Sequence, residues 1–549
     1  MGIVGVKNLL EEGFDVTGFE RCGYVGGLWH YTEDEDTLSV LECEFTLLAQ
    51  AADADVGLLL SRNVFELLTT VRDVTPISHS QKVGTQLSQR CPVSLLLTQT
   101  GTAAHCSARQ VEEYIESYVD HFDLRRHLRL NTAVERICRD DNVGQWRLDL
   151  KGQPSELFDK VLLATGPHVK PMMPKIEGFE SFTGRIIHSR AFKRPGAFAG
   201  MKVVVLGLGN TGGDICNALV GHASSIYLSH NNGAVVTPRE INGVPLTHKL
   251  SRRFFMIQGI LDDWFPKLSD WLFNQVARMF MRKFLGPIDP AWRLHPGPSV
   301  RISTPVISET LISNLRSEAV KSVPGIRRVC GPREVELGDG QRLEADAIIC
   351  CTGYGNSFDV LESRFDPTTD PPRAWLEAPG SKGRALPRLY QNVFSLEAPD
   401  SLAFLGCAWL VSGAFCLADI TSMCIAQVWA GKSELPGRPE MDRWVRRQEK
   451  RISGMAHRGT PIPASVHQRE WLVWADETAG LGMEQHLGWG WAGWVFWWRD
   501  HRLWKMLMDG VLASASWRVF EGKRRPWPGA RAELERLNSV YRGEARVTS

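Results

Sequence analysis

The chain lacks several features that mark particular classes of protein. Its 63 Lys and Arg balance 62 Asp and Glu, so no basic excess indicates a nucleic-acid partner. No run of about 18 apolar residues occurs, so no membrane-spanning helix is predicted. The first residues do not read as a secretory signal. These absences favour a cytoplasmic protein.

Closely spaced cysteine pairs are also absent. The twelve cysteines are scattered, without a CxxC pair or a Cys/His cluster at metal-ligand spacing. We expect reduced, buried thiols and no metal site.

A dinucleotide-binding turn is the first positive signal. An apolar strand run ends at Leu206, and Gly207, Gly209 and Gly212 follow as GxGxxG before a helical pattern that includes Asn210 and Thr211. In such a turn the helix N-terminus and its backbone N–H groups face a pyrophosphate. At 549 residues the chain is too long for one hydrophobic core, so two or three domains are expected.

A second motif precedes this turn at close spacing. Phe182, Gly184, His188 and Phe192 match the pattern FxGxxxHxxxF. Together with the GNTGGD string that begins at Gly209, this motif resembles the flavin-containing monooxygenases, a class of flavoprotein monooxygenases, and the tail resembles their fungal members. His188 reads either as part of a hinge between two nucleotide sites or as a histidine hydrogen-bonded in a structural turn; we favour the structural role.

The resemblance implies an α/β fold of two nested, doubly wound Rossmann-like dinucleotide-binding domains with a helical insert and tail. Strands ending near Gly166 and Gly353 resemble the two linkers between the domains. We therefore expect the following division: an FAD-binding domain over 1–170 and 326–430, an NADPH-binding domain over 171–325 with a helical insert at 245–300, and a Trp-rich helical extension over 431–549.

The FAD site is implied residue by residue. Glu20 closes a short strand, where an acid binds the adenosine ribose. Gly2 matches the last glycine of the family's first GxGxxG, whereas the first strand and two glycines have no counterpart here. The other implied cofactor-binding residues are Gly26, Gly27, Leu28, Trp29, Val134, Thr165, Gly166, Thr352 and Gly353.

Residues 42–106 depart from the resemblance. They lack the family's aromatic- and proline-rich loop and its asparagine beside the flavin. Two explanations stay open: an incorrectly translated intron or frame error, which we favour, and a divergent lobe.

Coenzyme choice is read at the end of the next strand, Ser225 to His230. No acid closes that strand, so a 2′-phosphate is tolerated and NADPH is favoured over NADH. The family's arginine is missing there, and Ser229, His230 and Arg239 are the candidate phosphate ligands.

The resemblance implies NADPH reduction of FAD and transfer of one oxygen atom of O₂ from a C4a-hydroperoxyflavin. We expect an N or S atom of a small organic substrate as acceptor, as in N,N-dimethylaniline monooxygenases, because Ala191-Phe192-Lys193 fits that branch. The fungal look of the tail suggests a specialised metabolite. Baeyer–Villiger oxygenation of a ketone and an impaired copy that binds no FAD are the alternatives, whereas a disulfide reductase would need a CxxC.

Two helical regions raise the question of a membrane. The insert either covers the active-site cleft or lies on a membrane surface, with Lys267, Arg278, Arg282 and Lys283 facing lipid headgroups. For the tryptophans at positions 489–504 we expect packing against the FAD domain rather than an anchor. Peripheral membrane contact is thus an open alternative.

Overall fold

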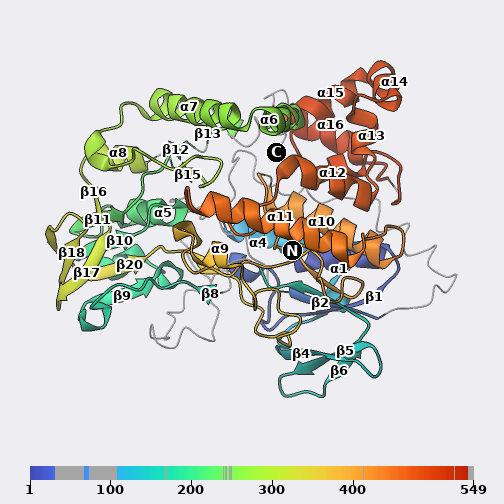
Figure 1. Cartoon of the computed structure of the whole chain (residues 1–549), viewed down its shortest axis with the longest axis horizontal. Coiled ribbons are helices and arrows are strands. Elements are labelled where there is room, and N and C mark those ends of the chain that lie inside the picture. Colours follow the sequence, from blue (N-terminus) through green and yellow to red (C-terminus); the bar gives the residue numbers. More distant parts are fainter. Residues whose placement is uncertain are drawn as a thin grey trace.

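Two five-stranded sheets organise the protein (Figure 1). The computed structural model describes residues 1–30, 67–72, 108–166, 170–238, 240–241, 244–245, 250–308, 310–411, 413–524 and 526–541. Both sheets carry helices, so the predicted α/β class is confirmed.

The second sheet in the chain is entirely parallel, in the order β16-β11-β10-β20-β9. Its strands are β9 (Arg185–His188), β10 (Lys202–Leu206), β11 (Ser225–His230), β16 (Lys321–Pro324) and β20 (Ala347–Cys350). Val203 and Val205 face a core shared with helices α5 (Asn210–Leu219) and α8 (Leu311–Arg316). Val204 faces the opposite core. Burial on both faces explains the unbroken apolar run of β10.

The first sheet has the order β22-β7-β2-β1-β3. Its strands are β1 (Asp15–Phe19), β2 (Leu67–Arg72), β3 (Leu128–Arg129), β7 (Lys160–Ala164) and β22 (Leu402–Phe404). Strand β2 runs antiparallel to both β1 and β7 and occupies the position between them. The family's first strand, which would be parallel, has no counterpart in the sequence. An antiparallel strand from the anomalous 42–106 stretch occupies the position between β1 and β7 instead. The rest of that stretch lies outside the described residues.

The two sheets are nested. All strands of the parallel sheet fall between β7 and β22 in the chain, as the fold prediction required. One predicted boundary needs correction. Strand β20 pairs with β10 and β9, and the small sheet β17-β18-β19 packs on the same unit, so the second unit extends past residue 325. Those three strands are β17 (Ile326–Gly331), β18 (Glu334–Leu337) and β19 (Arg342–Glu344). The other domain limits stay predictions.

Smaller elements complete the two units. Around the first sheet lie α1 (Gly2–Glu11), η1 (Gly27–Trp29), α4 (Ala108–His121), η2 (Arg125–His127), β4 (Val134–Asp140), β5 (Gln145–Leu150), β6 (Glu156–Phe158) and α10 (Ala414–Trp429). Around the second lie β8 (Lys170–Pro171), η3 (Phe179–Ser181), η4 (Ser189–Ala191), η5 (Pro195–Phe198), β12 (Val236–Thr237), β13 (Glu240–Ile241), β14 (Val244–Pro245), η7 (Pro290–Trp292), β15 (Val306–Ile307) and β21 (Tyr354–Gly355). The short elements α9 (Arg373–Leu376) and η8 (Pro379–Ser381) pack against the tail helix α11 (Arg438–Ala456).

The insert and the tail are helical, as expected. The insert forms a helix pair, α6 (Arg252–Trp264) and α7 (Pro266–Leu285). The tail consists of α11 (Arg438–Ala456), α12 (Gln468–Ala479), α13 (Met483–Leu487), α14 (Trp491–Arg499), α15 (His501–Asp509), η9 (Ser514–Arg518) and α16 (Ala530–Tyr541). Across the described parts of the chain, no helix combines the length and the apolar content needed to traverse a membrane.

A buried ion network ties the tail to the first sheet. The Arg518 guanidinium donates to both carboxylate oxygens of Asp419 on α10, at 2.6 and 2.8 Å. Arg524 donates to Glu11 on α1 at 2.6 Å, and Lys7 pairs with the same carboxylate at 2.7 Å. Helix α1 is therefore held from below by the sheet and from above by the C-terminal extension (Figure 1).

Candidate functional site

The glycine turn after β10 has the geometry of a pyrophosphate cradle. Gly207 has φ +120°, and a Cβ there would lie 2.5 Å from the carbonyl oxygen of Cys351. A Cβ on Gly212 would lie 2.0 Å from the carbonyl oxygen of Gly207. A Cβ on Gly209 would meet no atom within 4 Å. Only the middle glycine therefore faces open space, at the point where α5 begins and its N–H groups point outward.

This turn lies where nucleotides bind in doubly wound sheets. Strands β10 and β20 are parallel neighbours, so their carboxyl ends lie at the same edge of the sheet. Gly207 and Cys351 follow these two strands directly. Asn210 anchors the start of α5, because its Oδ1 accepts from the Ile307 N–H at 2.8 Å. Thr211 lies in the first turn of the same helix, half-buried.

Two of the three candidate ligands of a 2′-phosphate form hydrogen bonds within the protein. The Ser229 side chain is fully buried, and its hydroxyl donates to the Pro324 carbonyl at 3.0 Å. The His230 ring contacts Asn232 O at 2.9 Å and Ser322 Oγ at 2.8 Å. The expectation that these side chains bind phosphate is therefore corrected: they hold β16 and the following loop. Arg239 lies outside the described residues.

Arg293 is a basic side chain at this position that sequence reasoning missed. Ser322 Oγ, which contacts His230, donates to the Trp292 carbonyl at 2.8 Å and so brings η7 to the end of β11. Burial, and then the nearby charge of Arg293, lower the pKa of His230. Arg293 is exposed, and no ion pair involves it within the described part of the chain. Its separation from β11 by about sixty residues left no local signal.

The first sheet presents the residues expected around FAD. Glu20 directly follows β1, is 5 % exposed, and accepts the Cys22 N–H at 2.9 Å. The Thr132 N–H donates to the Glu20 carbonyl, which places Val134 close to the same strand end. Gly2 is buried at the first turn of α1, which packs beside β1.

The loop after Glu20 adds a polar atom without a partner. Gly26 and Gly27 have φ of +115° and +56°, which glycine adopts easily; Gly26 precedes the turn η1 and Gly27 is its first residue. The backbone of Leu28 belongs to η1, whereas its side chain is not among the described ones. The indole Nε1 of Trp29 is buried and has no hydrogen-bond partner among the described residues. A buried donor of this kind fits a site that receives a bound group.

His188 contacts one of the two predicted linkers. Thr165 and Gly166 follow β7, and Thr352 and Gly353 follow β20; both glycines have positive φ. His188 Nε2 lies 3.1 Å from the Gly353 carbonyl, and His188 Nδ1 accepts the Arg190 N–H at 3.2 Å. Burial lowers the pKa of His188 to about 4, so the ring is neutral. These contacts support the structural role.

The flanking residues of the signature pack away from His188. Phe182 belongs to the core beneath the β17–β19 sheet, and Phe192 stacks on Phe198 at 5.5 Å in the core beside α5. A Cβ on Gly184 would lie 2.5 Å from the Asp346 carbonyl oxygen. The motif thus marks a tight crossing between two cores.

The described part of the chain holds nine cysteines. None of the nine forms a disulfide, and no cluster that could hold a metal ion occurs among the described residues. Burial raises the pKa of the Cys350 thiol to about 12, and it also raises that of Cys351. These thiols are therefore unreactive, which agrees with the sequence reading against a disulfide reductase.

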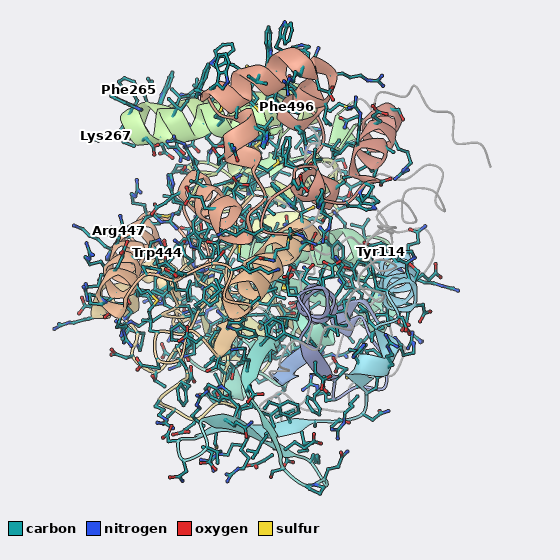
Figure 2. All side chains as sticks on the ribbon, turned by 90° about the vertical axis from the view of Figure 1, so that its right-hand side faces the viewer. Tyr114, Phe265, Lys267, Trp444, Arg447 and Phe496 are labelled. Atoms are coloured by element: carbon teal, nitrogen blue, oxygen red, sulfur yellow. The ribbon has the colours of Figure 1, made fainter. Side chains whose placement is uncertain are left out.

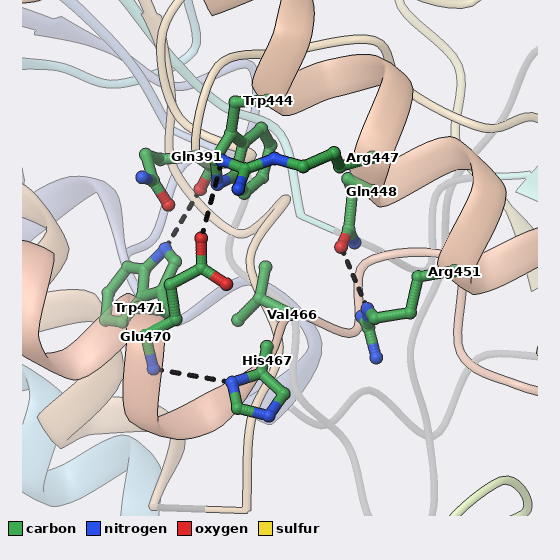
Figure 3. A pocket seen from close by; sticks show the side chains of 9 residues that line it. All are labelled: Gln391, Trp444, Arg447, Gln448, Arg451, Val466, His467, Glu470 and Trp471. Carbon is green, nitrogen blue, oxygen red and sulfur yellow. Dashed lines mark hydrogen bonds and ion pairs between the residues drawn. The ribbon is translucent and has the colours of Figure 1, made fainter. Parts of the chain in front are cut away.

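A half-open pocket of about 70 Å³ lies apart from these residues, between α11 and α12 (Figure 3). Trp444 and Trp471 flank it, and Glu470 pairs with Arg447 at 3.8 Å. Arg451 donates to Gln448 Oε1 at 3.1 Å and to the Ser465 carbonyl. None of the predicted cofactor-binding residues lines this pocket, and it is large enough only for a few waters or a small group.

Comparison with known proteins identifies the two-nucleotide arrangement. The family described as flavin-binding monooxygenase-like matches residues 102–534. The chain belongs to this family. It is 35% identical to Monooxygenase aurF of Gibberella zeae over 544 residues, which is 98% of this chain and 96% of that protein.

Solved structures with a similar fold support this assignment. S-allyl-L-cysteine S-oxygenase from Allium sativum superposes with TM-score 0.54 at 18% identity, covering 100% of this chain and 92% of that one. OTEMO in complex with FAD and NADP superposes with TM-score 0.56 at 17% identity, covering 87% and 95%. The predicted family and the fold of two dinucleotide-binding units are therefore confirmed, and so is the expectation of a flavoprotein monooxygenase.

Proposed function

We propose that this monooxygenase uses NADPH and FAD to transfer one oxygen atom of O₂ to a soft N or S atom of a small organic substrate. The observation that carries the proposal is the turn at 207–212, in which two glycines are packed against backbone and the middle one faces open space. The family match supports the flavin half of the proposal.

NADPH fits the crevice between β10 and β20. The N–H groups at the start of α5 would hold the pyrophosphate, and Gly209 would let it approach the backbone. We assign the 2′-phosphate to Arg293, because its planar guanidinium suits phosphate and its charge is felt at His230. Ser229 and His230 support that corner through their internal hydrogen bonds.

FAD fits the carboxyl end of the first sheet in part. Glu20 would accept the ribose hydroxyls, and the Trp29 indole would donate to the bound group. The position of the family's first phosphate-binding strand is taken by β2, so the pyrophosphate would rely on α1, whose first turn begins at Gly2. The remaining residues assigned to FAD are Gly26, Gly27, Leu28, Val134, Thr165, Gly166, Thr352 and Gly353.

When bound, FAD supplies the redox and oxygen chemistry, and the protein supplies position and protection. His188 ties the β9 end to Gly353 and so fixes the linker between the two nucleotide sites. Its neutral ring adds no charge at that junction. The buried network of Arg518 and Asp419 holds α1 in place from the tail side. The first contact would act at the junction of the two nucleotide units, and the second within the first unit.

The acceptor atom is proposed from the Ala191-Phe192-Lys193 segment, which fits the N- and S-oxygenating branch. We place the enzyme in the cytoplasm, and its substrate among specialised metabolites of a fungus. Oxygenation of a ketone is the second candidate and is an outcome of the test.

The test begins with the purified chain incubated with FAD. We expect flavin to stay bound through gel filtration, to bleach on anaerobic addition of NADPH, and to recover colour in air. NADPH consumption would then be measured with a tertiary amine, a thioether and a cyclic ketone as test substrates, and the products would be identified by mass spectrometry. An N-oxide or sulfoxide supports the proposal, and an ester replaces it with ketone oxygenation. Failure to retain FAD would identify an impaired copy.

A further inference from the structure

The helical insert and the tail expose large aromatic side chains at one end of the molecule. Trp491, Trp498 and Trp264 are 83%, 80% and 75% exposed. We call the exposed apolar side chains of α7, α14 and their flanks the aromatic face: Trp264, Phe265, Leu268, Trp271, Leu272, Val276, Met279, Trp489, Trp491, Trp494, Trp497 and Trp498. A group of large exposed apolar side chains of this kind usually marks an interaction site. The expected packing against the FAD domain is therefore wrong for Trp489, Trp491, Trp494, Trp497 and Trp498, whereas Trp504 does pack against the core around the first sheet.

Helix α7 is fixed with this side outward. Ser269, Asn274 and Met281 are buried against the body of the protein. Asn274 donates to Ser299 Oγ at 2.9 Å, and Ser269 contacts Asp262, which pairs with Arg301. The opposite side of the helix therefore points to solvent, although it carries Leu268, Trp271, Leu272 and Met279.

The tail helices join the insert at the same end. Arg253 on α6 donates to both carboxylate oxygens of Asp509 on α15, at 2.5 and 3.0 Å, and Arg252 pairs with Glu484. Figure 1 places α7, α14 and α15 along one edge, and the view turned by 90° keeps them there. Phe265 and Lys267 are labelled at that edge in Figure 2. The two helical segments thus form one surface.

Basic side chains border the aromatic face. Exposed cations on α7, α14 and α15 are Lys267, Arg282, Lys283, Arg499, Arg502 and Lys505. The acids on and beside the same helices are engaged elsewhere: Asp270 accepts from Ser299, Asp500 pairs with Arg531, and Asp509 pairs with Arg253. Arg502 pairs with Glu535 at 3.9 Å, whereas no ion pair among the described residues involves the other five cations. The face therefore combines exposed indoles with positive charge that is largely unpaired.

We propose that the aromatic face docks on the surface of a membrane that contains anionic phospholipids. Indole rings suit the boundary between headgroups and acyl chains, because one edge is apolar and the N–H remains hydrated. The bordering cations would contact the negative headgroups. A second copy of the chain fits less well, since its equivalent face would bring like charges together. The inference does not depend on the chemistry proposed above.

The test is co-flotation of the full-length, FAD-incubated protein with vesicles. One set is pure phosphatidylcholine and one contains about 30 mol% phosphatidylserine. We expect flotation with the anionic set, weakened by added salt because headgroup attraction is screened. Arg282→Ala with Lys283→Ala should lower the partition coefficient roughly 25-fold, at about fivefold for each basic side chain. Trp491→Ser with Trp498→Ser should lower it at least about tenfold.

Matched controls lie at the other end of the molecule, in the β4–β6 sheet (Figure 1). Val143 is 57% exposed and Arg136 is also exposed, so Val143→Ser with Arg136→Ala removes similar groups from a different surface. This control should float like the unaltered protein. The proposal is overturned if the unaltered protein remains in the bottom fraction and floats with neither the neutral nor the anionic vesicles. It is also overturned if both variants of the aromatic face float as the unaltered protein does. A dimer in sedimentation analysis that the tryptophan variant dissociates would also overturn it. Equal unfolding midpoints would show that the variants are folded.

Discussion

Replacing Gly209 with alanine separates nucleotide binding from folding. The residue has φ −126° and ψ −176°, an extended conformation that alanine adopts freely. The added methyl group would meet no protein atom within 4 Å. The change therefore places one carbon atom where we assign the pyrophosphate, without a clash with the rest of the protein.

The structure sets the size of both effects. Alanine at a compatible glycine position stabilises a protein by about 0.4–1 kcal/mol, because the unfolded chain loses freedom. A methyl group that keeps a phosphate from the helix N–H groups removes at least one charge-assisted hydrogen bond, about 1.5–3 kcal/mol. NADPH should bind roughly 10- to 150-fold more weakly, by that estimate. Gly212→Ala is the contrasting change, because its Cβ would lie 2.0 Å from the Gly207 carbonyl oxygen.

Equilibrium titration of NADPH by calorimetry, together with urea unfolding, measures both quantities without turnover. Gly209→Ala should keep or slightly raise the unfolding free energy while weakening NADPH. Gly212→Ala should lower the unfolding free energy by about 3 kcal/mol. Unchanged NADPH affinity in a folded Gly209→Ala protein would refute the assigned crevice. A large loss of stability in that variant would refute the reading of open space.

Four further changes test other parts of the site. Arg293→Ala should weaken NADPH roughly tenfold or more and leave NADH unchanged in the same titration, because only NADPH carries the 2′-phosphate. Trp29→Phe should leave the FAD-free protein as stable or more stable, since it removes a buried donor without a partner, but weaken FAD retention in gel filtration. Between pH 6.5 and about 4 the free energy of unfolding in urea should fall as the pH falls, because His188 binds a proton in the unfolded chain but not in the folded one; His188→Gln should make this fall smaller. Asp419→Asn should cost about 3–5 kcal/mol of unfolding free energy, because it leaves Arg518 buried and uncompensated; Glu377→Gln, in the exposed pair with Arg373, should leave the unfolding midpoint unchanged.

The parallel unit was predictable because its signals are local. The apolar run of β10, the glycine spacing and the helical pattern that follows all lie within twenty residues, and each reports on its own geometry. The same holds for Glu20 at the end of β1. The position of β2 in the first sheet was not predictable. Its pairing with β1 and β7 depends on contacts between distant segments, and no glycine turn near β2 marks it in the sequence.

Contacts between residues that are far apart in the chain could not be predicted from the sequence. Arg293 reaches the end of β11 only because Ser322 bonds both His230 and the Trp292 carbonyl, so its placement is a property of the folded chain. Conversely, Ser229 stands at the predicted strand end, yet its hydroxyl is turned to the Pro324 carbonyl. Which way a strand-end side chain points depends on the neighbouring strand, and that neighbour, β16, lies about ninety residues away.

The tail shows a different limit of pattern reading. Large apolar side chains are buried in most folds, so a cluster of tryptophans predicts a core by default. In α14 the residue turned inward is Gly493, while Trp491, Trp494 and Trp498 share the outward side at a spacing of three and four residues. Because this helix has a glycine on its buried side and indoles on its exposed side, the default prediction that the tryptophans form a core does not hold for α14. Sequences that break a local rule without loss of fold do so where function requires it, and here the surface requires a partner that accepts indoles and cations together.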